Sequence, residues 1–151
     1  MPNAKIKTIV AAEQVVIDRE SGNVTVVGIL QSPIGWSFPF AFPYISCFFA
    51  LELDGEVPEE EVAKPQIFNL IFRVLIGDKE IVRQPFQTNF LDKWVSNGAI
   101  KLNGLVVEKP SKIKFEILQS DGKSIGDYCF CVNQPPQPKV SVSVQPNLVA
   151  A

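Results

Sequence analysis

Hydrophobic and polar residues alternate along most of the chain, and this pattern predicts β-strands. The clearest example has apolar residues at Ile113, Phe115 and Ile117 with charged residues between them. Because successive side chains of a strand point to opposite faces, this segment is expected to bury one face and expose the other. No segment has a convincing helical period. Eight strands are expected, at residues 5–17, 24–31, 45–53, 66–76, 80–90, 99–107, 113–117 and 128–132.

Turn signals separate these strands. A polar loop at residues 18–23 joins the first two strands into a hairpin, and the dipeptide Asp121-Gly122 predicts a second hairpin before the last strand. Residues 45–53 and 66–76 carry apolar side chains on both faces, which favours central positions in a sheet. The pattern predicts an all-β fold, an antiparallel β-sandwich of about eight strands, with immunoglobulin-like and C2-like topologies both open.

Three local features modify the simple alternation. The first strand is long and is expected to bend near Ala11-Ala12. Pro85 cannot donate to a ladder, so the fifth strand is expected at an edge or to contain a bulge. In the sixth strand the apolar phase slips at Asn103-Gly104, and a bulge at the glycine would explain the slip.

The segment from Trp36 to Tyr44 has an aromatic ring at every second position. The rings belong to Trp36, Phe38, Phe40, Phe42 and Tyr44. In an extended chain all five would share one face. Pro39 and Pro43 favour extended geometry and remove two backbone donors, so we expect a crossing segment or an edge strand. The rings either fill one open end of the sandwich or form a contact surface for a partner.

Residues 134–151 form a predicted tail behind a domain that spans residues 1–133. Three prolines at the start of the tail predict a stiff, extended linker. After them, Val140, Val142 and Val144 alternate with serines. This alternation predicts a ninth strand that docks on its own sheet or pairs with another chain, including a second copy of the protein; the remaining alternative is disorder.

Composition limits the classes of partner. The 151 residues suffice for one domain with a core, and 46% apolar and 20% charged residues are ordinary for a soluble globular protein. The net charge of −2 argues against nucleic-acid binding, which needs a basic face. No apolar run approaches the roughly 20 residues of a membrane helix, and none forms a signal-peptide core. We therefore expect a cytoplasmic protein that binds neither nucleic acid nor membrane.

The side chains of common catalytic and metal sites are scarce. Histidine, the commonest general base and metal ligand, is absent. The three cysteines are Cys47, Cys129 and Cys131, an odd number that argues against a disulfide framework. Cys129 and Cys131 are expected on the outer face of the last strand, and with no histidine they do not complete a four-ligand metal site. With no nucleophile elbow or phosphate loop, we expect no enzyme, no cofactor and no metal.

An acidic segment begins at the end of the third predicted strand and continues toward the fourth. Its acids are Glu52, Asp54, Glu56, Glu59, Glu60 and Glu61. Calcium needs several converging oxygen ligands, but this spacing matches no calcium-loop signature and Pro58 interrupts it. We interpret the segment as a solvated loop. The alternative function it leaves open is a C2-like ligand-binding module that takes calcium here or a carbohydrate on the aromatic rings.

Several stretches resemble a family of small bacterial or phage-encoded β-sandwich proteins of unassigned function. The stretches are residues 5–18, 22–30, 104–107 and 112–118, together with Pro110. The similarity extends to about Val132. It implies a cytoplasmic, single-domain bacterial protein and provides no catalytic residues.

The leading hypothesis is a non-enzymatic protein–protein interaction or assembly module. Its contact surface would be the aromatic stretch from Trp36 to Tyr44, with strand donation by residues 140–144 as a second contact. Aromatic side chains are enriched at protein interfaces, and the donor-poor backbone of this stretch argues against a central strand.

Overall fold

The computed structural model describes residues 3–54, 60, 66–90 and 95–136. Eight β-strands account for most of this part of the chain, as the alternation predicts. Their bounds are β1 (Asn3–Ile17), β2 (Val24–Ile29), β3 (Phe40–Asp54), β4 (Ile67–Ile76), β5 (Lys79–Asn89), β6 (Val95–Val107), β7 (Ser111–Gln119) and β8 (Ser124–Val132). All strand pairs within the sheets are antiparallel.

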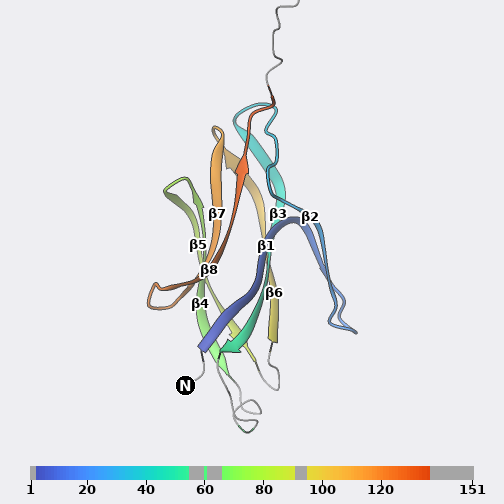
Figure 1. Ribbon diagram of the computed structural model, residues 1–151, viewed down its shortest axis with the longest axis vertical. Helices are drawn as coiled ribbons and strands as arrows, with labels where there is room; N and C mark the ends of the chain where they lie inside the picture. Colours follow the sequence, from blue (N-terminus) through green and yellow to red (C-terminus); the bar gives the residue numbers. More distant parts are fainter. Residues whose placement is uncertain (1–2, 55–59, 61–65, 91–94, 137–151) are drawn as a thin grey trace, which may run out of the picture.

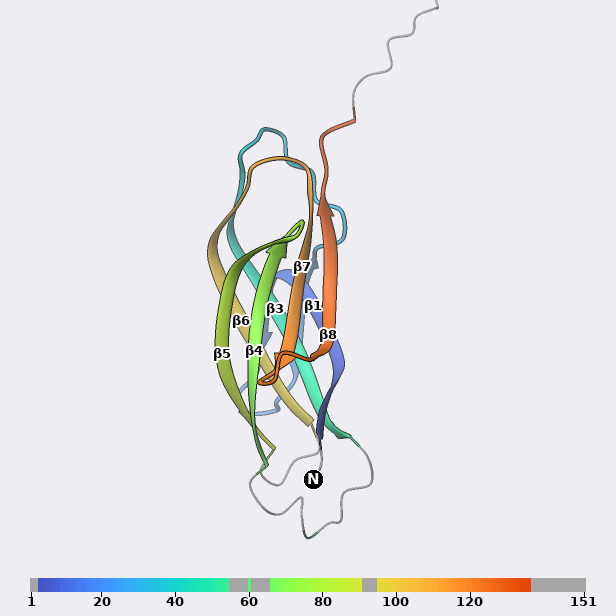
Figure 2. The same cartoon turned by 90° about the vertical axis from the view of Figure 1, so that its left-hand side faces the viewer.

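The strands form two four-stranded sheets that face each other (Figures 1 and 2). One sheet has the order β2-β1-β3-β6 and is called sheet A; the other has the order β5-β4-β7-β8 and is called sheet B. The antiparallel sandwich is therefore confirmed, and β3 and β4 are central as expected. The strand order differs from that of an immunoglobulin constant domain, in which one sheet has four strands and the other has three.

Apolar side chains from both sheets fill the space between them. Edge-to-face aromatic pairs run through this core, with ring centroids 5.6 Å apart for Phe72 and Phe115, 5.7 Å for Phe115 and Phe130, and 6.0 Å for Phe130 and Phe42. All four side chains are buried. Since such pairs add to the area that aromatic rings bury, this row of rings anchors sheet B to β3.

The predicted phase slip in β6 is present, but it does not shift the register between strands. The buried side of β6 passes from Leu105 to Leu102, while in β3 it passes from Phe42 to Ile45. The pairs Phe42–Leu105 and Ile45–Leu102 keep one continuous register. Gly104, with φ of 81°, supplies the left-handed conformation within the slip. Both strands therefore change face together.

The two halves of β1 pair with different strands. Residues 3–12 of β1 pair with β3 inside the sandwich, whereas residues 12–17 pair with β2. Ala11 and Ala12, where the bend was expected, are fully buried, and the pairing of β1 passes from β3 to β2 at Ala12. Beyond it β1 and β2 leave the sandwich as a two-stranded projection, visible in blue in Figure 1. We call residues 12–29 the hairpin arm.

Both predicted hairpin loops have side-chain support. In the loop of the arm, the Asp18 carboxylate accepts hydrogen bonds from the backbone N–H groups of Glu20 and Ser21. These two bonds lower the pKa of Asp18. Before β8, the Asp121 carboxylate accepts a hydrogen bond from the N–H of Lys123 at 2.9 Å. Such short Asp side-chain bonds are typical of tight turns.

Candidate interaction surface

The five aromatic rings of the predicted contact stretch do not share one face. Trp36 and Tyr44 are 76% and 61% exposed, whereas Phe42 is only 7% exposed. Phe38 and Phe40 are partly buried against the core. The stretch is therefore divided: the central rings belong to the end of the sandwich, and the first and last rings face solvent. The expectation of a single five-ring face is wrong.

The phase slip in β3 explains why Tyr44 turns outward. Strict alternation from Phe40 and Phe42 would place Tyr44 on the core side. Because the core side passes to Ile45 instead, the Tyr44 ring lies on the outer face of sheet A. There the Lys101 ammonium lies 4.6 Å from the centre of the Tyr44 ring, a cation–π contact.

Local packing explains why the central rings are drawn inward. A Cβ atom at Gly35 would lie 2.8 Å from the ring of Phe38, so the absence of a side chain lets this ring fold back onto the crossover. The rings of Phe40 and Phe42 meet edge to face at 5.0 Å. The peptide bond between Phe38 and Pro39 is cis. Trp36 precedes this compact group, and its indole remains in solvent.

The crossover that carries Trp36 is hydrogen-bonded to the end of β8. The Gly35 N–H donates to the Asn133 carbonyl at 2.9 Å, and the Asn133 N–H donates to the Pro33 carbonyl at 3.0 Å. The Tyr128 hydroxyl donates to the Leu30 carbonyl at 2.7 Å. These bonds fix residues 30–35 to sheet B, so Trp36 projects from an anchored segment.

The hairpin arm also exposes apolar side chains, and none of them is among the contact residues predicted from the sequence. Val16, Ile17, Val27 and Ile29 are each between 42% and 50% exposed. A signal was present in the sequence, because valines follow one another in β1 and in β2 and so occupy both faces of the hairpin. We call the following residues the exposed apolar set: Val16, Ile17, Val27, Ile29, Ile34, Trp36, Tyr44 and Val106.

The outer face of sheet B carries paired charges, unlike the exposed apolar set. Glu116 on β7 is buried, and its carboxylate receives the Arg73 guanidinium of β4 at 2.5 Å and the Lys114 ammonium at 3.3 Å. The same ammonium lies 3.5 Å from the Asp127 carboxylate of β8. These ion pairs cross three strands and neutralise one another, so we interpret them as structural.

Burial and ion pairing shift the pKa of Glu116 in opposite directions. Burial by itself raises the pKa of the carboxyl, but hydrogen bonds from Ser124 and Arg73, the Arg73 charge and a hydrogen bond from Lys114 hold the pKa below its usual value of 4.5. Glu116 is therefore a charged, paired acid in the fold rather than a proton donor poised near neutral pH.

The three cysteines are free thiols in two environments. Cys47 is fully buried on β3, and desolvation raises the pKa of its thiol to about 12. Cys129 and Cys131 are exposed on β8, on the outer face as predicted. In the described part of the chain, no three Cys, Asp or Glu side chains lie close enough to hold a metal ion.

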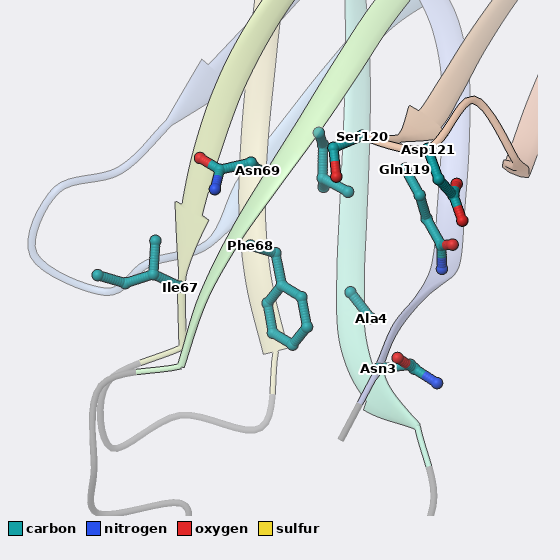
Figure 3. A pocket seen from close by; sticks show the side chains of 9 residues that line it. Asn3, Ala4, Ile67, Phe68, Asn69, Gln119, Ser120 and Asp121 are labelled. Carbon is teal, nitrogen blue, oxygen red and sulfur yellow. The ribbon is translucent and has the colours of Figure 1, made fainter. Parts of the chain in front are cut away.

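An open pocket lies at the end of the sandwich near the start of β1 (Figure 3). Its volume is about 240 Å³, below the roughly 300–1,000 Å³ of most small-molecule sites. Two of its polar side chains already have partners: the Asn69 side-chain carbonyl accepts a hydrogen bond from Gln87, and Asp121 accepts one in the turn before β8. The pocket therefore offers little to a ligand.

Two predicted sites fall mainly outside the described residues. The acidic segment is described only at Glu52, Asp54 and Glu60, and Glu52 forms an ion pair with Lys5 at 3.3 Å. Val140, Val142 and Val144 of the tail also lie outside the described residues. Calcium binding and strand donation therefore stay predictions.

Comparison with known proteins does not identify a family for the chain. A scan against protein-family models finds no match to the chain, and a search among curated proteins finds none either. The resemblance to small bacterial or phage sandwich proteins therefore stays a prediction. Within the described residues, no helix has the length and apolar character needed to cross a membrane.

Proposed function

We propose that the protein is a non-enzymatic interaction or assembly module that binds another protein through its exposed apolar set. The observation that carries this proposal is that most of the exposed large apolar side chains come from one part of the sequence. Of the ten large hydrophobic side chains that are exposed in the described residues, eight belong to residues 16–44 or to Val106 beside β3. Exposed apolar side chains, among them an accessible tryptophan and tyrosine, are typical of protein-binding surfaces.

Further observations support the class of function and the compartment. Histidine is absent from the chain, and the buried acid Glu116 is committed to ion pairs. Both favour binding over acid–base catalysis. Three free cysteines, two of them exposed, fit a reducing compartment, and we infer a cytoplasmic location.

The test compares two pairs of exposed apolar side chains. The double variant Trp36→Ser, Tyr44→Ser removes the two exposed rings, and Ile67→Ser, Ile81→Ser removes two exposed side chains of sheet B as a matched control. We expect the ring variant to reduce the affinity for a partner isolated with the wild-type protein at least tenfold, while the control retains it. Both variants should keep the wild-type melting temperature. Equal partner binding by all three proteins would contradict the proposal.

A further inference from the structure

The two exposed cysteines of β8 lie on the outer face of sheet B, each opposite a lysine of β7. Cys129 pairs with Lys114 and Cys131 pairs with Lys112 (Figure 2). Residues that pair directly across antiparallel strands share one face of the sheet, with Cβ atoms about 4.5–5.5 Å apart. Each thiol therefore has a lysine as its cross-strand neighbour, which permits a comparison of the two positions.

The surroundings of Cys129 contain carboxylates. The Lys114 ammonium lies 3.3 Å from the Glu116 carboxylate and 3.5 Å from the Asp127 carboxylate. Asp127 precedes Cys129 by two positions on β8, so the two side chains lie on the same face of the strand. The positive charge beside Cys129 is therefore neutralised by two acids.

The surroundings of Cys131 are different. The side chain of Lys112 is exposed, and it forms no ion pair with any residue that the structure describes. On the β4 side, the Gly77 N–H donates to the Lys112 carbonyl at 2.9 Å. Gly77 has no side chain, and no atom lies within 4 Å of the place that a Cβ would take. Lys112 thus has a thiol on one side and open space on the other.

An open pocket of about 490 Å³ occupies this part of the outer face. Its lining includes the cations of Arg73, Lys112 and Lys114 and the carboxylate of Asp78. Arg73 and Lys114 are both paired with Glu116, so in the described part of the chain Lys112 is the lining cation that is free to bind an added anion. The volume lies within the range of small-molecule sites.

We propose that Cys131 is a modification site, at which the thiol forms a mixed disulfide with a short anionic peptide thiol supplied as its disulfide. Neighbouring strands are about 4.8 Å apart, so the pocket on the β4 side of Lys112 lies within about 10 Å of Cys131 on β8. A peptide of three residues spans about that distance. Its sulfur can therefore reach Cys131 while a carboxylate contacts the Lys112 ammonium.

The reaction is a thiol–disulfide exchange. The Cys131 thiol releases its proton and attacks one sulfur of the disulfide; a new S–S bond forms, the old one breaks, and the other half leaves as a thiolate that takes up a proton. The disulfide is the oxidant and is reduced to one thiol, while Cys131 is oxidised. Cys129 is poorly placed to displace the adduct, because alternate residues of a strand have Cα atoms about 6.6 Å apart, near the upper limit for a disulfide.

This inference is independent of the proposed function, since no residue of the exposed apolar set belongs to a strand of sheet B. The backbone of Cys131 is also fixed. Its N–H donates to the Gln31 carbonyl at 3.3 Å, and its carbonyl accepts a hydrogen bond from the Asn133 side chain at 3.4 Å. The thiol therefore projects from an anchored part of β8.

Two reagents of opposite charge test the selectivity. The full chain is treated at low ionic strength with oxidised glutathione, which is anionic, or with cystamine, a cationic disulfide, and peptide mass spectrometry measures the rate at each cysteine. We expect oxidised glutathione to modify Cys131 at least fivefold faster than Cys129, and cystamine to lack this preference. The buried Cys47 should stay unmodified in the folded protein. The same preference for Cys131 with both reagents would mean that charge does not select the thiol, which overturns the proposal.

A pair of lysine variants tests the role of Lys112. Lys112→Gln should slow the reaction of Cys131 with oxidised glutathione at least threefold and leave the reaction with cystamine no slower. Lys123→Gln changes the net charge equally at the opposite end of β8 and serves as the matched control, with wild-type rates. Both lysines are exposed, so both variants should keep the wild-type melting temperature. Equal rates at Cys131 in all three proteins overturn the proposal.

Discussion

The hairpin formed by β7 and β8 and the hairpin arm of β1 and β2 are both antiparallel strand pairs, but their apolar side chains have opposite environments. In β7 the inward residues Ile113, Phe115 and Ile117 are fully buried, and the residues between them are charged and paired across strands. In the arm, the paired residues Val15 and Val26 lie on one face, and exposed valines occupy the other.

This contrast shows that alternation predicts burial only where a second sheet is present to cover the strand. β7 lies in the middle of sheet B and faces sheet A, whereas the arm projects from the sandwich after the bend in β1 (Figure 1). A hairpin that is apolar on both faces and has no second sheet against it keeps hydrophobic area in water. In the arm that area is available for contacts, while in β7 it stabilises the fold.

The largest expected difference comes from truncating one side chain in each hairpin. Phe115→Ala removes a fully buried ring that meets Phe72 and Phe130 edge to face, and it should lower the free energy of unfolding by about 3–5 kcal/mol. Val27→Ala in the arm should cost under about 1 kcal/mol, because the side chain is half exposed. Urea denaturation of both variants measures the two values. Equal losses would mean that the two hairpins are equally buried.

A smaller effect is expected from the charged face of β7. Glu116→Ala leaves the Arg73 guanidinium and the Lys114 ammonium without their shared carboxylate. Both cations retain some access to water, so the expected loss is roughly 1–3 kcal/mol rather than the cost of a fully buried charge. Glu13→Ala on the exposed surface of the arm is the control and should stay within about 0.5 kcal/mol of wild type in the same denaturation series. If Glu13→Ala lowered the free energy of unfolding as much as Glu116→Ala, the ion pairs of β7 would contribute no more to stability than an exposed charge of the arm.

The ion-paired Glu116 carboxylate also allows a prediction of how the free energy of unfolding depends on pH. Burial opposes ionisation of Glu116, but hydrogen bonds and cation partners outweigh it, so its pKa in the folded state lies below the usual 4.5. The stabilisation is therefore complete above pH 4.5 and is lost as the pH falls through the lower folded-state value. Glu116→Gln should flatten the decline of the urea midpoint below pH 4.5. If the urea midpoint of Glu116→Gln declined as steeply as that of the wild type, the decline would come from other acidic residues.

Most of the fold could be predicted from the sequence. Strong alternation, as in β7, fixes which residues face the core, and Asp121-Gly122 marks a tight turn that the structure contains. The central positions of β3 and β4 follow from apolar side chains on both faces. These features depend on local sequence and on a few strong propensities, which is why pattern alone is sufficient.

The candidate surface was harder to predict because it depends on contacts between distant segments. The outward turn of Tyr44 requires a slip that β3 and β6 make together, and the inward position of Phe38 requires the close approach of Gly35. Neither is encoded in the alternation of residues 36–44. The exposure of Val27 likewise depends on where β1 bends away from β3, which is a tertiary property.

The smallest expected effect is the sharpest test of the arm. Val27→Thr with Ile29→Thr keeps branched side chains and strand propensity while removing two exposed apolar groups. Because both residues are about half exposed, the pair should change the free energy of unfolding by less than about 1 kcal/mol in urea titrations. A loss as large as that from Phe115→Ala would mean that a covering element already buries this face in the folded monomer. The arm would then be part of the core, and its valines would no longer be available to a partner.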